Sequence, residues 1–170
     1  MRGLGHCDAC HAPRGLLGAI DPTPELKGGL IPQLHWFAPG LAPSRGGAAK
    51  AELRAQRVAL LKTGRSTHAS ASGPMAEVVF NSTQRLADAD LQAIALFLTE
   101  LPVLASPAPR STAVDPLAPS TFEAGRALCK DRFTPCHGEA GEGTPGAYPP
   151  LAGNSTVRMD PPANLVRMIL

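Results

Sequence analysis

The chain has 170 residues, a formal net charge of +2, 18% charged residues and 4% aromatic residues. The small net charge and the lack of a run of Lys and Arg argue against nucleic-acid binding. No apolar run approaches the ~20 residues that a membrane-spanning helix needs.

The first motif along the chain is Cys7-Asp-Ala-Cys10-His11, a C-x-x-C-H sequence. Two thiols three positions apart lie on one side of a helical turn and can add to the two vinyl groups of one porphyrin. His11 follows directly, as the proximal ligand of the iron. The motif therefore predicts a c-type haem held by Cys7 and Cys10, with His11 on the iron. A redox dithiol would need a βαβ context and a zinc site a second ligand pair at short spacing, and neither surrounds the motif.

Residues 15–47 are rich in Gly and Pro and contain the only tryptophan, in His35-Trp36-Phe37-Ala38-Pro39. We expect a long loop over one edge of the haem. Trp36 and Phe37 either cover that edge or fill the core, and His35 is expected at the surface. A buried porphyrin would supply apolar surface that a core of Ala, Leu and Val lacks.

A helix is predicted over residues 48–63, with Gly64 as its stop. Further along, Gly73-Pro74 fixes a turn and Met75 follows directly. A methionine in a turn ahead of a short helix can present its thioether to a haem iron. Met75 is therefore the predicted second axial ligand of this haem.

The clearest helical pattern covers residues 88–101. Its apolar residues recur at i, i+3, i+4, i+7 and i+10, at Leu91, Ile94, Ala95, Leu98 and Leu101. Pro102 ends the helix. Haem helix, loop, helix, ligand methionine and terminal helix follow one another as in a class I cytochrome c domain. We assign residues 1–103 to one such domain that lacks its N-terminal helix.

The second half begins like the first. A Pro-rich linker is expected over residues 104–119. The capping-box pattern Ser120-Thr-Phe-Glu123 predicts a helix to about Arg132, with Phe122 and Leu128 buried. A Cys-His pair, a Gly- and Pro-rich loop and a helix from about residue 161 follow. We interpret residues 120–170 as the N-terminal part of a second cytochrome c domain, so the predicted fold class is all-α.

Several stretches of the chain resemble the multihaem cytochrome c subunits of membrane-bound bacterial dehydrogenases, the partners of alcohol, gluconate and sorbitol dehydrogenases. They are Gly5–Gly15, Trp36–Pro39, Leu61–Arg65, Ser72–Val79, Leu86–Ala95, Gly138–Gly143 and Tyr148–Asn154. Such subunits are typically longer and carry three haem domains. The resemblance implies that Cys7 and Cys10 carry thioethers, and that His11 and Met75 are axial ligands. It also makes His137 the proximal ligand of a second haem, whose methionine would lie beyond Leu170.

The second attachment site departs from that family, which usually has aromatic-x-x-x-Cys-x-x-Cys-His. Here the sequence is Cys129-Lys-Asp-Arg-Phe133-Thr-Pro-Cys136-His137. Seven helical residues separate the two thiols by ~10 Å, so Cys129 is too far to replace the missing one. Phe-x-x-Cys-His resembles the single-cysteine attachment of some mitochondrial cytochromes c. We expect one thioether from Cys136, His137 on the iron, and Cys129 as a free, buried thiol. The alternative is a decayed site without haem.

The resemblance implies electron transfer, because a His/Met-ligated haem has no open position. Electrons would pass from a quinoprotein or flavoprotein catalytic subunit toward membrane quinone, at the periplasmic face of the bacterial inner membrane. The chain itself is not expected to be an enzyme. Arg14 and Arg65 would pair with haem propionates or be ordinary surface charges.

The start of the chain leaves alternatives open. Met1 lies six residues before Cys7, which leaves no room for a signal peptide, so we expect a longer gene product. If Met1 were the true start, the chain would be a haem-free remnant in the cytoplasm. A cytochrome-type peroxidase is a further alternative and would need an open or displaceable ligand.

Overall fold

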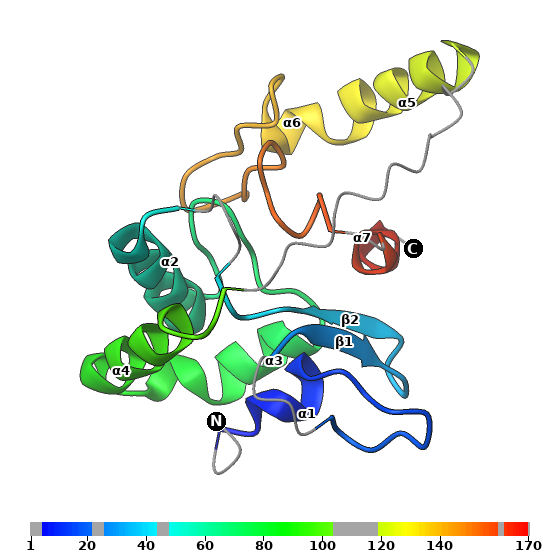
Figure 1. The fold of residues 1–170 in the computed structure, drawn as a ribbon. Coiled ribbons are helices and arrows are strands. Elements are labelled where there is room, and N and C mark those ends of the chain that lie inside the picture. Colours follow the sequence, from blue (N-terminus) through cyan, green and yellow to red (C-terminus); the bar gives the residue numbers. More distant parts are fainter. Residues whose placement is uncertain (1–4, 22–25, 44–47, 104–118, 160–161, 170) are drawn as a thin grey trace.

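The computed structural model describes residues 5–21, 26–43, 48–103, 119–159 and 162–169. The elements follow in the order α1 (Cys7–His11), β1 (Gly28–Ile31), β2 (Trp36–Pro39), α2 (Lys50–Thr63), α3 (Pro74–Asn81), the 3-10 helix η1 (Thr83–Arg85), α4 (Asp88–Thr99), α5 (Pro119–Arg132), α6 (Thr134–His137) and α7 (Ala163–Ile169). In Figure 1 the elements up to α4 gather at one end, α5 and α6 project away from them, and α7 lies beside β2. The fold is helix-rich, as predicted.

A two-stranded sheet corrects the prediction of an all-α chain and of a loop over residues 15–47. β1 and β2 pair antiparallel, with Gly28 opposite Pro39 and Ile31 opposite Trp36. Gly28 has φ +83°, and a Cβ there would lie 2.5 Å from the Ala38 carbonyl oxygen. Only glycine permits this close approach of the two strands. Part of the stretch that suggested a loop, from Gly28 to Pro39, is therefore a hairpin.

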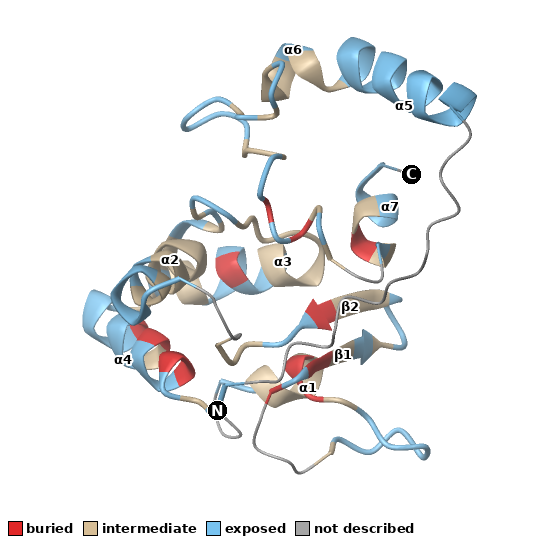
Figure 2. Cartoon of the chain, turned by 45° about the horizontal axis from the view of Figure 1, so that its top comes forward, coloured by how far each residue is buried: buried red, intermediate tan, exposed pale blue. Residues whose placement is uncertain are grey.

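Helices α2 and α4 pack against each other, and α4 supplies buried apolar residues to the core, whereas no residue of α2 is buried. Leu91 and Ala95 of α4 are completely buried, and Leu98 is 5% exposed. Gly64 ends α2 with φ +75°, and its N–H donates to the Leu60 carbonyl. α4 ends at Thr99, two residues before the predicted end. Figure 2 shows that buried residues also lie on α1, β2, α3 and α7.

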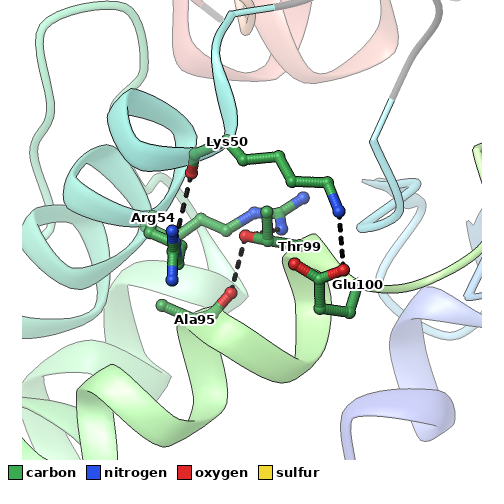
Figure 3. A network of polar contacts seen from close by, with 6 residues as sticks. Lys50, Arg54, Ala95, Thr99 and Glu100 are labelled. Carbon is green, nitrogen blue, oxygen red and sulfur yellow. Dashed lines mark hydrogen bonds and ion pairs between the residues drawn. The ribbon is translucent and has the colours of Figure 1, made fainter.

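A polar network joins the same two helices (Figure 3). Thr99, 1% exposed, donates its hydroxyl to the Ala95 carbonyl oxygen at 2.7 Å. The Arg57 guanidinium of α2 donates to the same hydroxyl at 2.9 Å. Lys50 and Glu100 form an exposed ion pair at 2.6 Å. The network fixes the end of α4 against α2, because the Thr99 hydroxyl bonds the half-buried Arg57 of α2 and the Ala95 carbonyl of α4 at once.

Helix α5 differs from its prediction in two respects. It begins at Pro119, which suits the first helical position, and Glu123 pairs with Arg126 at 2.7 Å, so the capping box does not form. Phe122 and Leu128 are each 60% exposed, so their predicted burial was wrong. The reason is that no part of the described chain covers α5, all of whose residues are exposed.

Residues 104–118 of the expected linker lie outside the described residues. Within the parts of the chain that the structure describes, no helix is long and apolar enough to cross a membrane. Helix α7 lies within the last predicted helix, from Ala163 to Ile169.

Candidate haem sites

The first site is built on α1, which begins at Cys7 and ends at His11. Cys7 and Cys10 are half-buried and His11 is buried, at 9% exposed. The backbone turns extended at Ala12, ahead of Pro13, which ends the helix after little more than one turn. Burial raises the pKa of the Cys7 thiol. Two half-buried thiols and a buried imidazole thus lie on one short helix, in the order that the C-x-x-C-H motif gives them.

His11 is fixed by a hydrogen bond between its Nδ1 and the Pro39 carbonyl oxygen, at 2.7 Å. Because a carbonyl only accepts, Nδ1 carries the proton and the Nε2 lone pair is available. Burial lowers the pKa of His11, so the ring is neutral near pH 7. A neutral imidazole whose other nitrogen donates to a main-chain carbonyl is the arrangement of metal-bound histidines. The donor set at His11 therefore fits a haem iron.

Met75 lies in the first turn of α3, directly after a turn whose backbone conformation favours glycine. Gly73 has φ +50° and ψ −133°, and Pro74 then occupies the first turn of α3. A Cβ on Gly73 would lie 2.6 Å from ring atoms of Trp36, so the Trp36 ring packs on this turn. Met75 follows, half-buried. Strand β2 thus contacts both predicted ligand segments, through Pro39 at His11 and through Trp36 at the turn before Met75.

The second site repeats the histidine arrangement of the first. His137 Nδ1 hydrogen-bonds the Pro149 carbonyl oxygen at 2.8 Å, which again leaves Nε2 available. Phe133 and Tyr148 flank the imidazole, with ring centroids 6.5 Å and 5.9 Å away. Cys136 is half-buried on α6, directly before His137. These residues fit a haem held by one thiol and one imidazole.

Cys129 is a free thiol, as predicted, but it is exposed rather than buried. It lies on α5, and the exposure of that helix explains the difference. Its carbonyl accepts the N–H of Phe133 at 3.0 Å, so the helical path continues into Phe133. A hydrogen bond with Cys136 raises the pKa of the Tyr148 hydroxyl. Tyr148, rather than Cys129, is thus the polar neighbour of the Cys136 thiol.

The two arginines considered for propionates bind main-chain carbonyls. Arg14 donates to the Ala9 carbonyl at 2.8 Å and to the Gly18 carbonyl at 3.0 Å, which ties the loop after α1 to that helix. Arg65 donates to the Gly146 carbonyl at 2.9 Å. Both side chains therefore organise loops near the candidate sites.

Sequence reasoning missed Pro39 and Pro149, the partners of the two histidines. Every residue has a main-chain carbonyl, so residue type does not indicate which carbonyl accepts the hydrogen bond from a histidine. The only signal was that each proline lies in a stretch that resembles the dehydrogenase cytochromes.

A cavity of about 430 Å³ is lined by Ala76 and Val79 of α3, but neither His11 nor Met75 lines it. Its walls include Lys62, Phe80 and Pro149, so residues of the N-terminal and C-terminal parts of the chain meet there. It adjoins the second site through Pro149.

Comparison with known proteins identifies the family of the chain. The family model for cytochrome c matches residues 4–102. The cytochrome c subunit of alcohol dehydrogenase (quinone) from Gluconacetobacter polyoxogenes is 34% identical, over 99% of this chain and 38% of its own length. The fructose dehydrogenase cytochrome subunit of Gluconobacter japonicus is 32% identical, over 98% of this chain and 38% of its own.

The gluconate 2-dehydrogenase cytochrome c subunit of Pantoea cypripedii is 30% identical over 100% of this chain and 41% of its own length. The chain therefore spans 38–41% of the length of these three relatives. The resemblance that the sequence stretches indicated is confirmed, and the chain belongs to the cytochrome c family.

Proposed function

We propose that the chain transfers electrons through covalently bound haem. They would come from a quinoprotein or flavoprotein dehydrogenase catalytic subunit and go toward membrane quinone. The observation that carries this proposal is the buried, neutral His11, with its Nδ1 held by Pro39 and two thiols on the same helix. The three similar proteins described above are cytochrome subunits of dehydrogenases, which supports a dehydrogenase catalytic subunit as the partner.

In this proposal Cys7 and Cys10 would hold the haem by thioethers, and His11 Nε2 and Met75 Sδ would bind its iron. When bound, the haem supplies a one-electron couple, and methionine ligation raises its potential. His11 stays in one tautomer because Pro39 accepts from Nδ1. Two protein ligands on the iron would leave no place for peroxide, so this ligand set favours electron transfer over a peroxidase.

A second haem is proposed at His137 on α6, held by a single thioether from Cys136. The support is the hydrogen bond to Pro149, which reproduces that of His11 to Pro39. Residues 1–103 and 120–170 would then be two cytochrome c domains joined by residues 104–119. A decayed second site is the competing interpretation.

Covalent haem attachment belongs to an oxidising, extracytoplasmic compartment, so we place the protein at the periplasmic face of the inner membrane. The test is periplasmic expression followed by a haem stain on a denaturing gel and a reduced-minus-oxidised spectrum. We expect the unaltered chain to stain for haem and the Cys7→Ala/Cys10→Ala/Cys136→Ala variant not to stain. No stain on the unaltered chain would favour the haem-free remnant.

Met75 is tested in the same material. Met75→Ala should abolish the weak sulfur-to-iron band at the red end of the oxidised spectrum and lower the potential. Met168→Ala is the matched control, because Met168 is 45% exposed on α7. An unchanged band in Met75→Ala would remove this residue from the site.

The second haem is tested in the Cys7→Ala/Cys10→Ala variant, which leaves Cys136 as the attachment point. A pyridine haemochrome band at longer wavelength than two thioethers give is expected, because one vinyl group remains. Absence of covalent haem in this variant would mean that the second site has decayed.

A further inference from the structure

The N-terminal part of the chain (residues 5–103) and the C-terminal part (residues 119–169) meet at a buried amide. Asn164 of α7 is 5% exposed. Its Oδ1 accepts the N–H of Phe37 at 2.8 Å, and its Nδ2 donates to the Phe37 carbonyl at 2.8 Å. One side chain of the C-terminal part thus satisfies both main-chain groups of a residue in β2, 127 positions away in sequence.

The geometry of the sheet explains why Phe37 is available. The sheet has two strands, and Phe37 stands opposite Leu30. In an antiparallel pair, alternate residues direct their N–H and C=O away from the partner strand. The N–H and C=O groups of Phe37 lie on the outer edge of β2, where a further strand would bind. The Asn164 amide offers one donor and one acceptor in a plane, as a peptide group of that strand would.

A second contact lies at the other side of the C-terminal part. Asn154, 3% exposed, donates to the Pro150 carbonyl at 3.0 Å and to the Ser70 hydroxyl at 3.5 Å. The N–H of Ser155 donates to the His68 carbonyl at 2.8 Å. Pro150 directly follows Pro149, whose carbonyl holds His137. This contact therefore reaches the loop that orients the second histidine.

We propose that Asn164 is a positioning residue that fixes the distance between the two haem sites. Strand β2 orients His11 through Pro39, and the same strand binds Asn164 through Phe37. The C-terminal part carries His137. Electron tunnelling between two centres falls steeply with their separation, so a fixed contact sets its rate. The effect on transfer rests on the proposed second haem, whereas the contact itself does not.

The experiment compares full-length haem-loaded protein with its Asn164→Leu and Asn164→Asp variants. Leucine removes the donor and the acceptor, and aspartate keeps the size and an acceptor if leucine prevents folding. Asn81→Leu is the matched control, because Asn81 is exposed at the end of α3. Amide hydrogen exchange in the peptide that contains Phe37 should become about tenfold faster in Asn164→Leu and remain unchanged in the control.

The same samples report the consequence for electron transfer. The haem spectra and both potentials should stay as in the unaltered protein, while flash-initiated transfer between the two haems becomes slower and multiphasic. Unchanged Phe37 exchange in both Asn164 variants would overturn the contact. Faster exchange with unchanged transfer would overturn the positioning role. Absence of a second haem in the unaltered protein would refute the proposed second site. The exchange comparison would still show whether Asn164 binds Phe37.

Discussion

The turn before Met75 offers the sharpest test of how this fold holds a ligand. Gly73 combines φ +50° with ψ −133° and is followed by Pro74. A side chain disfavours this region of φ and ψ, and the following proline restricts it further. A Cβ would also lie 2.6 Å from the Trp36 atoms Cε2 and Cζ2. Gly73→Ala therefore adds backbone strain and a clash with an aromatic ring at the same position.

The magnitude follows from these two contributions. Placing a side chain in a glycine-only region of the backbone costs about 1–3 kcal/mol. Forcing an extra carbon against a packed side chain costs about 1–3 kcal/mol more. The free energy of unfolding should therefore fall by about 2–6 kcal/mol, a large part of the 5–15 kcal/mol of a typical domain. Relief of the clash should displace the turn, so the sulfur-to-iron band of the oxidised protein should weaken.

The assay is denaturant unfolding of the haem-loaded protein, with the oxidised spectrum recorded on the same samples. Gly18→Ala is the matched control, because Gly18 has φ +78° and nothing within 4 Å of its Cβ position. It should cost only about 1–2 kcal/mol of backbone strain and leave the band intact. If Gly73→Ala costs no more than Gly18→Ala and keeps the band, Trp36 does not fix this turn.

Three further predictions follow from the polar groups. Thr99→Val should lower the free energy of unfolding by about 1–3 kcal/mol, because the half-buried Arg57 loses an acceptor; an unchanged denaturation midpoint would contradict this. Lys50 lowers the pKa of Glu100 below its ordinary 4.5, so this pair stabilises the fold above pH 4.5 and the effect is lost as the pH falls through the lowered pKa. The difference in Tm between the unaltered protein and Glu100→Gln should be small and should vanish in acid; a difference that persists in acid would refute the assignment. Cys129→Ala should leave the pyridine haemochrome unchanged, and a shift would show that this thiol reaches the second haem.

Local signals predicted the parts of the fold that depend on neighbours along the chain. The periodicity of Leu91, Ala95 and Leu98 and the stop at Gly64 predicted α4 and α2. The spacing of the C-x-x-C-H motif predicted α1, and Gly73-Pro74 predicted the turn before Met75. Each of these features is set by residues that are close together along the chain, so the local sequence is enough to predict it.

The features that the sequence did not predict depend on contacts between residues that are distant along the chain. The hairpin of β1 and β2 was not predicted, because glycine is rare in strands. Gly28 is nevertheless required there, since a Cβ would clash with the Ala38 carbonyl of the partner strand. Phe122 and Leu128 are apolar, yet their exposure depends on whether another element covers α5. The carbonyl partners of the histidines could not be identified from residue type at all.

Strand β2 has four residues, and three of them contact different parts of the chain. The Trp36 ring packs on Gly73, the Phe37 main chain binds Asn164, and the Pro39 carbonyl binds His11. A one-residue insertion in the turn before β2 would shift its register and exchange its two faces, disturbing all three contacts together. Substitutions within this strand will therefore not be additive, and double-mutant cycles between them should show coupling energies of about 0.5–3 kcal/mol.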